Sequence, residues 1–422
     1  MEKLVWFKDR EKLVILTLLF LGGLLGGLDR YTINFAVVLM EKDLNLSAAS
    51  IGMVLSAFFA GYAIMQMPGG WLADKFGSRR VILVSITAWS IFTILTGIAW
   101  SLPILILIRF MYGIGEGGYF PASASLVAQK FEKNESGRAI SVLLSASYIM
   151  GFLAPLITTS LMASIGWRKM FYVYGFGGFL ILPLFYFLLK GPEQPQPSVD
   201  QNPSARETEK KYSLKGILGV PMLWLVFVGA FGTFTVMWGI ASWMPTLLHK
   251  VYGLDLRSIG WYAFFPPFLS LITIYIGGFL TDKLPLKTSK LLAGFCLGCA
   301  AIMLFIIATI SLHVLLLNVL MTIITMACSI VIIVFNSIPL KQFPGEAVGF
   351  TSGFIYTGTQ IAGFTAPLIM GIIVDAFGGS FTGAFVYLMV ISLIGMVCFF
   401  AASRFEGQVV SRESLFLNSK HA

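Results

Sequence analysis

Charged residues are scarce in this chain. Only 12% of its 422 residues are Asp, Glu, Lys or Arg, whereas a soluble globular domain has about 25%. Hydrophobic residues make up 57%, which excludes both a soluble monomer and a disordered chain. The net charge of +9 comes from short basic clusters between apolar runs and not from one basic segment, so we expect no nucleic-acid partner.

Residues that commonly carry enzymatic chemistry are also few. The three histidines, His249, His313 and His421, have no acidic neighbour at helical spacing. The four cysteines lie inside apolar stretches, and we interpret them as packing residues and not as metal ligands. No G-x-x-x-x-G-K-[ST] loop occurs, which disfavours an ATP-driven pump. We therefore predict no cofactor, no metal and no enzymatic activity, and a membrane-integral enzyme is the disfavoured alternative.

Long apolar runs make up most of the chain. About 20 apolar residues in a helix cross a bilayer. Between charge and turn clusters we find twelve such windows, near 13–40, 48–72, 80–100, 103–130, 138–163, 169–190, 216–248, 258–281, 290–310, 313–336, 347–373 and 381–404. The first is read as a retained span because no small-residue cleavage pattern follows it. The fold class expected is an all-α integral membrane protein with twelve transmembrane helices.

A polar stretch from 191 to 215 separates six spans from six. It carries four prolines and no periodic apolar face, so we predict a cytoplasmic linker between an N-terminal six-helix bundle (1–190) and a C-terminal bundle with a short tail (216–422). Two blocks repeat between the halves: Gly69–Lys75 with Gly277–Lys283, and Gly151–Ile157 with Gly363–Ile369. Such a repeat predicts two pseudo-symmetric bundles around a central site at mid-membrane.

The basic residues predict the orientation of the chain. If the N-terminus is cytoplasmic, most Lys and Arg lie in inner segments. Only Lys42, Arg168, Lys169, Lys250 and Arg257 then fall in outer loops. We therefore predict a plasma membrane protein, in the inner membrane if the source is bacterial, with both termini in the cytoplasm.

Four ionisable residues lie deep within the predicted spans, and we call them the charge network: Asp29, Arg30, Arg109 and Glu116. Each costs roughly 2.5 to 3.5 kcal/mol at a helix centre, so four together predict mutual pairing or a wet cavity. Arg109 and Glu116 share a helix face but lie about 10.5 Å apart along the axis, which disfavours a direct bridge. We expect Arg109 to lie near Asp29 and Glu116 near Arg30.

The second half holds no charge at the corresponding positions, where Met321 and Cys328 replace Arg109 and Glu116. A network that merely held a bundle together would be needed in both halves. The asymmetry therefore favours a role in chemistry, in which a carboxylate beside an arginine exchanges a proton when an anion competes for the arginine. A static structural network is the alternative.

Four sequence stretches resemble a known family: GLDRYTINFAV from Gly27, SAFFAGYAIMQMPGGWLAD from Ser56, GGWLADKFGSRR from Gly69, and RFMYGIGEGGYFPA from Arg109. They resemble the major facilitator superfamily and, within it, the anion:cation symporter branch of hexuronate, galactonate and sialic acid carriers. The resemblance implies proton-coupled uptake of carboxylated sugars and related organic anions. It also implies functional roles for the four residues of the charge network, and it leaves the ligand open.

Candidate site residues follow from these patterns. The substrate-binding candidates are polar or aromatic residues within spans, for most of which helix–helix hydrogen bonding is the alternative: Arg30, Tyr62, Tyr148, Trp243, Asn336, Tyr356 and Gln360. For Trp243 the alternative is an interfacial tryptophan. The proton-coupling candidates are Asp29, Arg109 and Glu116. The gate candidates, at the cytoplasmic ends of spans, are Asp74, Arg79, Arg138 and Asp282.

We predict a secondary active transporter that works as a monomer and carries a small organic anion, such as a sugar acid, together with protons. A proton-coupled exporter or antiporter of drugs is the alternative. Arg30 argues against that alternative, because a buried cation repels cationic drugs and attracts carboxylates. The anion, the stoichiometry and the choice between proton and sodium are left open by the sequence.

Overall fold

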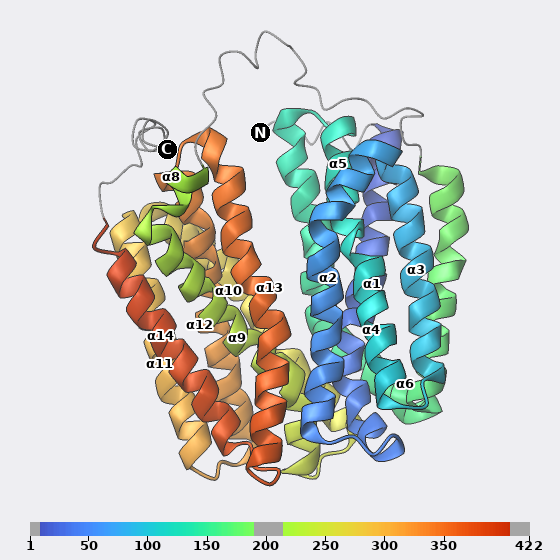
Figure 1. Ribbon diagram of the computed structural model, residues 1–422, viewed down its shortest axis with the longest axis vertical. Coiled ribbons are helices and arrows are strands. Elements are labelled where there is room, and N and C mark those ends of the chain that lie inside the picture. Colours follow the sequence, from blue (N-terminus) through green and yellow to red (C-terminus); the bar gives the residue numbers. More distant parts are fainter. Residues whose placement is uncertain (1–8, 190–213, 406–422) are drawn as a thin grey trace. The chain divides into compact units, whose positions relative to one another are not determined.

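The computed structural model describes residues 9–189 and 214–405. Within these ranges the regular secondary structure is entirely α-helical (Figure 1). Lipid offers no hydrogen-bond partner to the backbone, so an apolar segment satisfies its N–H and C=O groups by forming a helix. The predicted all-α fold class is confirmed.

The helices of the first half are α1 (Arg10–Asp43), α2 (Ala48–Phe76), α3 (Ser78–Ile98), α4 (Leu102–Gly117), α5 (Tyr119–Lys130) and α6 (Lys133–Leu188). Those of the second half are α8 (Leu214–Leu218), α9 (Pro221–Lys250), α10 (Leu256–Lys283), α11 (Leu286–Thr309), α12 (Val314–Gln342), α13 (Gly345–Ala376) and α14 (Thr382–Ala402). Polar side chains cap the N-termini of α1 and α2. The Asp9 carboxylate accepts hydrogen bonds from two backbone N–H groups in the first turn of α1, and the Ser47 hydroxyl accepts one from a backbone N–H of α2.

The number of crossings agrees with the sequence prediction. Ten helices in the described ranges are long and apolar enough to cross a membrane. One of them, α6, contains two predicted spans, which join at Gly166, where the positive φ of 78° suits glycine. The shorter helices α4 and α5, which meet at Gly118, together cover the span predicted at 103–130. With α6 counted as two crossings and α4 with α5 as one, the described residues account for the twelve predicted spans.

The described residues form two compact units. The N-terminal unit comprises 9–189 together with 249–264, and the C-terminal unit comprises 214–248 and 265–405. The predicted linker lies outside the described residues apart from 214 and 215, so the domain boundaries stay predictions. The segment 249–264 joins the N-terminal unit through Lys250, which pairs with Glu41 at 2.5 Å, and through Phe264, whose ring packs against Phe152.

Close helix packing builds the interior of the N-terminal unit, where α2 packs on α4 and both α1 and α3 pack on α6 (Figure 1). A Cβ atom on Gly113 of α4 would lie 2.2 Å from the carbonyl oxygen of Phe58 on α2, so only glycine permits this approach. The close contact places the aromatic side chains of α2 beside the charged residues of α4.

The C-terminal unit is built on the packing of α11 against α12 and α14. The hydroxyl of Ser392 on α14 is buried and donates to the carbonyl of Leu297 on α11 at 2.9 Å. Such a bond satisfies a polar group that would otherwise face only apolar side chains.

Candidate functional site

Two helices supply the charge network of the N-terminal unit. Asp29 and Arg30 are consecutive residues of α1, so their side chains point about 100° apart around the helix. Arg109 and Glu116 lie two turns apart on α4. Asp29, Arg109 and Glu116 are buried, whereas the side chain of Arg30 keeps 20% of its surface exposed. The arginine of α1 is therefore the most accessible charge of the four.

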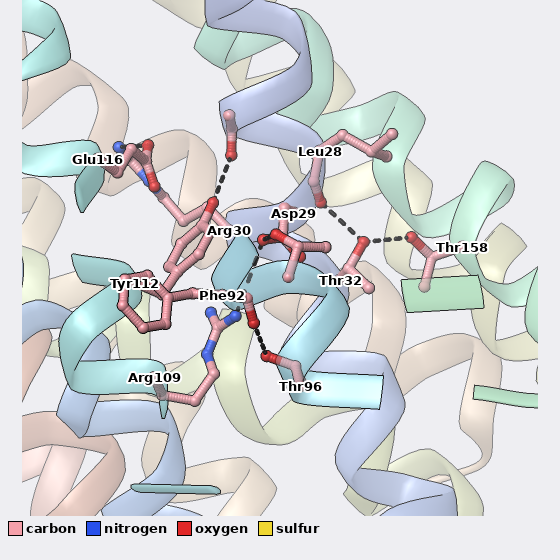
Figure 2. Close-up of polar contacts among 12 residues, drawn as sticks. Leu28, Asp29, Arg30, Thr32, Phe92, Thr96, Arg109, Tyr112, Glu116 and Thr158 are labelled. Carbon is pink, nitrogen blue, oxygen red and sulfur yellow. Dashed lines mark hydrogen bonds and ion pairs between the residues drawn. The ribbon is translucent and has the colours of Figure 1, made fainter. Parts of the chain in front are cut away.

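The charges pair across the two helices (Figure 2). The Arg30 guanidinium donates to Glu116 Oε1 at 2.5 Å. Arg109 lies 4.0 Å from Asp29 Oδ2, which is an ion pair without a hydrogen bond. The predicted pairing of Arg109 with Asp29 and of Glu116 with Arg30 is confirmed. Two acids and two bases give the network no net charge, so an anion that enters it disturbs that balance.

Several polar atoms of the network have no hydrogen-bond partner among the described residues. They are Asp29 Oδ1, Glu116 Oε2, the Nε of Arg30 and all three nitrogens of Arg109. Buried polar groups in folded proteins are usually paired. The network therefore has unpaired acceptors on its carboxylates and unpaired donors on its arginines. In a purely structural cluster of ion pairs we would expect these atoms to be paired.

Aromatic rings support both arginines. The Arg30 guanidinium lies 4.8 Å from the ring centroid of Tyr62 and 5.3 Å from that of Phe58. Arg109 lies 4.5 Å from the ring of Tyr112 and 5.8 Å from that of Phe58. Cation–π contacts of this kind are strongest where water is excluded. Tyr62, a predicted substrate residue, is thus buried beneath Arg30, and Phe58 and Tyr112 are members of the site that the sequence interpretation missed.

A second omission is Thr93 of α3, whose hydroxyl donates to Asp29 Oδ2 at 2.6 Å. No sequence spacing relates Thr93 to Asp29, because the two residues are 64 positions apart on different helices. Tyr112 had a local signal, since it is one helical turn after Arg109 and one turn before Glu116.

The other predicted substrate residue of this unit, Tyr148 on α6, has 42% of its surface exposed. Its assignment to the substrate stays a prediction.

Three predicted substrate residues of the C-terminal unit lie on the consecutive helices α12 and α13: Asn336, Tyr356 and Gln360. The Asn336 amide of α12 donates to the carbonyl of Ile332, and Asn336 also interacts with the hydroxyl of Tyr356 on α13. Tyr356 is 44% exposed, and Gln360 is half-buried one turn further along α13. These side chains offer neutral donors and acceptors, and their contact with substrate stays a prediction.

Trp243 is enclosed in the interior of the C-terminal unit. It is 2% exposed, its indole N–H donates to the carbonyl of Pro367 at 3.1 Å, and its ring contacts Phe381. A side chain with its donor used and its ring enclosed is a packing residue in this structure. The expectation that Trp243 caps a cavity by stacking stays a prediction.

The predicted gate residues do not pair with one another in this structure. Asp74 and Asp282 are exposed, and no hydrogen bond or ion pair is present between either of them and another described residue. Arg79 instead donates to the carbonyl of Tyr186 and lies over its ring. Arg138 is exposed on α6. Their role in gating stays a prediction.

The C-terminal unit holds one buried charge that was not expected. Lys290, at the start of α11, is 1% exposed, and its ammonium donates to Gln342 Oε1 at 2.8 Å and to the carbonyl of Ala402 at 3.2 Å. The expectation that only the first half buries charges is wrong in this respect. Lys290 lies at a helix end, where the sequence pattern does not show whether a lysine points inward or outward.

No group of three or more His, Cys, Asp or Glu residues that could hold a metal ion occurs within 9–189 and 214–405. The side chains of the charge network themselves are of types that can bind an anion, through arginine, and take up or release a proton, at a carboxyl group.

Comparison with known proteins finds relatives that are named as probable transporters of organic acids. The chain is 29% identical to the probable galactarate/D-glucarate transporter GarP of Escherichia coli K12, over 92% of this chain and 93% of that protein. It is 28% identical to the probable sulfoacetate transporter SauU of Cupriavidus necator, over 86% and 88%. It is 29% identical to the probable galactarate/D-glucarate transporter GudP of Bacillus subtilis, over 90% and 89%.

Solved structures share the fold at lower identity. A bacterial homologue of the human lysosomal transporter Spinster, inward-facing and unoccupied, superposes with a TM-score of 0.78 at 18% identity, over 94% of this chain and 98% of that one. The D-xylose–proton symporter gives a TM-score of 0.76 at 16% identity, over 92% and 97%. The family model of the Major Facilitator Superfamily matches residues 19–367. With the helical fold and the named relatives, this match shows that the chain is a membrane transporter, not an enzyme, and belongs to the Major Facilitator Superfamily.

Proposed function

We propose that this transporter carries a small organic anion, such as a sugar acid, another carboxylate or a sulfonate, across the membrane together with protons. The relatives support the substrate class, because galactarate, D-glucarate and sulfoacetate are all organic acids that are anions at neutral pH. We propose further that it works as a monomer in the plasma membrane, the inner membrane if the source is bacterial, with both termini in the cytoplasm. The distribution of Lys and Arg supports this orientation.

The observation that carries the proposal is the contact between Arg30 and Glu116. Arg30 is partly exposed and has an unpartnered Nε, and its guanidinium already donates to one oxygen of the buried Glu116 carboxylate. The planar guanidinium binds a carboxylate or a sulfonate through two parallel hydrogen bonds. An incoming anion therefore competes with Glu116 for the same group.

This competition links the anion to a proton. When the anion takes Arg30, the buried Glu116 loses its nearest positive charge. A buried carboxylate without a counter-charge binds a proton. A monoanion adds one negative charge to the neutral network and one proton removes it, whereas a dianion such as D-glucarate requires two protons. The bound complex is then neutral again, which lowers the cost of moving it through a low-dielectric interior.

Asp29 is the second proton site in this proposal. It is the weaker-paired acid, because Arg109 lies 4.0 Å away and its nearest donor is a neutral hydroxyl. Two carboxyl groups of different surroundings allow more than one proton to accompany each anion.

A drug exporter driven by protons is the competing function. The partly exposed Arg30 disfavours it, because the most accessible charge of the site is positive and repels cations. A substrate panel separates the two: organic cations stabilise a drug exporter, and organic anions stabilise the proposed transporter.

Thermal unfolding of the purified protein tests the substrate class. Galactarate, D-glucarate, sulfoacetate, D-xylose and a quaternary ammonium compound are added in turn at millimolar concentration. A ligand at 100 times its Kd stabilises the folded state by about 2.7 kcal/mol, so a bound anion raises the unfolding temperature. Stabilisation by an anion and none by D-xylose supports the proposal, whereas stabilisation by the cation alone contradicts it.

Uptake into proteoliposomes then tests the coupling. The active anion is supplied under an imposed pH gradient, with the membrane potential held at zero, in sodium-free and sodium-containing buffers. Accumulation against the gradient of the anion, driven by protons in both buffers, is the expected result. Accumulation that requires sodium, or only equilibration, contradicts proton coupling.

A further inference from the structure

Helix α3 carries four hydroxyl side chains at intervals of three residues, at positions 87, 90, 93 and 96. Three of them form the same local bond, in which the hydroxyl donates to the carbonyl four residues earlier. The bonds are Thr87 to Leu83 at 2.9 Å, Ser90 to Ile86 at 2.7 Å and Thr96 to Phe92 at 2.8 Å, and Figure 2 shows the last of them. This is the usual bond for a Ser or Thr inside an apolar helix.

Thr93 is the exception among the four. Its hydroxyl donates to Asp29 Oδ2 on α1 at 2.6 Å, and both side chains are buried. Arg109 approaches the same oxygen only to 4.0 Å, so a neutral hydroxyl and not the arginine makes the shortest contact to Asp29. A bond of this length to a charged acceptor is stronger than one to a carbonyl.

The hydroxyl of Thr93 has one proton to donate and two possible acceptors. One is Asp29, and the other is the carbonyl of Trp89, which lies four residues earlier as in the three neighbouring bonds. The ionised carboxylate attracts the hydroxyl more strongly than the carbonyl does. Once Asp29 is protonated, that difference disappears and the local bond becomes competitive.

We propose that Thr93 is the positioning residue of Asp29: its hydroxyl holds the ionised carboxylate on α1 and turns to the Trp89 carbonyl when Asp29 takes up a proton. The contact between α1 and α3 is thereby made in one protonation state and released in the other. Its place in transport rests on the proposed function, in which Asp29 is a proton site. The contact itself does not depend on that function.

Other groups also face Asp29, and the test must separate Thr93 from them. Arg109, Tyr112 and Glu116 come from α4, Tyr174 comes from α6, and Arg30 is the next residue of α1. None of these groups is on α3. A substitution at Thr93 therefore removes one donor to Asp29 and leaves the charges around it in place.

Infrared difference spectroscopy of the purified full-length protein, without substrate, measures the protonation of Asp29 through the carbonyl stretch of its acid form. The band is assigned by its loss in Asp29→Asn. Thr93→Val removes the donor and keeps the volume of the side chain, so the ionised form loses support and Asp29 is half protonated at a higher pH. A shift of about one pH unit, tenfold in proton affinity, is expected.

Two matched variants complete the test. Thr93→Ser keeps the hydroxyl and restores the titration of the parent protein. Thr96→Val removes an equally buried hydroxyl from the same helix, one that bonds only to Phe92, and leaves the titration unchanged. If Thr93→Val does not fold, Thr93→Ala removes the same donor with a smaller side chain.

An unchanged titration in a folded Thr93 variant without the hydroxyl overturns the proposal. So does an equal shift in Thr96→Val, because it reports a general effect of α3 packing. The absence of any Asp29-dependent carbonyl band between pH 4 and 10 also overturns it, since Asp29 then holds one protonation state throughout. Failure of the proposed function has a separate signature: the parent protein shows no proton-driven accumulation in proteoliposomes, while the infrared result stands.

Discussion

The two units of this transporter are repeats of one helical plan, yet they bury different side chains at corresponding positions. On α4 the N-terminal unit buries Arg109 and Glu116. At the same repeat positions in α12 the C-terminal unit buries Met321 and Cys328, which are 1% and 0% exposed. The comparison teaches that a membrane bundle of this kind packs without charges at these positions, which supports the proposed role of the N-terminal charges in transport.

The one buried charge of the C-terminal unit strengthens this distinction. Lys290 lies at the start of its helix, and Gln342, the Ala402 carbonyl and the Met222 sulfur all accept from its ammonium. Arg109 of the N-terminal unit has three nitrogens without a hydrogen-bond partner among the described residues. A lysine with its donors occupied is suited to holding helix ends together, whereas an arginine with free donors is suited to changing partners.

The largest effect on anion binding is expected at Arg30, because it is the charge of the N-terminal unit that we propose binds the substrate. Arg30→Lys keeps the positive charge but loses the planar pair of donors, and we expect anion affinity to fall by tenfold or more. Binding of the identified anion to the purified variant measures this. Near-native affinity in the lysine variant would remove Arg30 as the carboxylate anchor.

Next in size is the effect of Glu116→Gln, which imitates the protonated acid. Without the carboxylate, Arg30 is always available, so we expect the variant to bind the anion and exchange it across the membrane. It should lose accumulation driven by a pH gradient. Exchange and accumulation are measured in the same proteoliposomes, and accumulation equal to that of the parent protein contradicts the coupling role.

A smaller effect, on stability and not on coupling, is expected for the buried charge of the other unit. Lys290→Met leaves Gln342 Oε1 without its donor, at a cost of about 1 to 3 kcal/mol. The Ala402 carbonyl loses one donor and still accepts from the Phe405 N–H at 3.3 Å. The unfolding temperature should fall by several degrees while the ratio of exchange to accumulation is kept. The exposed Lys287 on the same helix is the control, and Lys287→Met should lower the unfolding temperature by less than Lys290→Met does. A selective loss of accumulation in Lys290→Met would contradict the distinction between the units.

The smallest effect is expected at the repeated aspartates near the ends of α2 and α10. Asp74 and Asp282 are both exposed, and exposed ion pairs contribute little. Asp74→Asn should shift the labelling rate of a reporter cysteine on the inner end of the span at 103–130 by at most a few-fold, and Asp282→Asn by less. Identical labelling in a folded Asp74→Asn variant excludes it from the gate, and a much larger change would show a paired state of Asp74 absent from this structure.

The sequence by itself determined the helical class, the twelve crossings and the four central charges, because length, apolar character and the cost of a buried charge are local properties. Helical spacing within α4 was enough to reject a direct bridge between Arg109 and Glu116, and the pairing with α1 followed from the small number of available partners. The repeat between the halves also identified Met321 and Cys328 as the residues of the second half that correspond to Arg109 and Glu116.

Only the tertiary structure decided which uncharged side chains join the charges. Thr93 is one of four similar hydroxyls on α3, and Phe58 is one of 37 phenylalanines, so neither had a sequence signal of its own. Lys290 shows the same limit, since it was not expected to be buried. The direction in which a side chain points depends on how helices far apart in the chain rotate and approach each other. That arrangement is set by the packing of all the side chains between them.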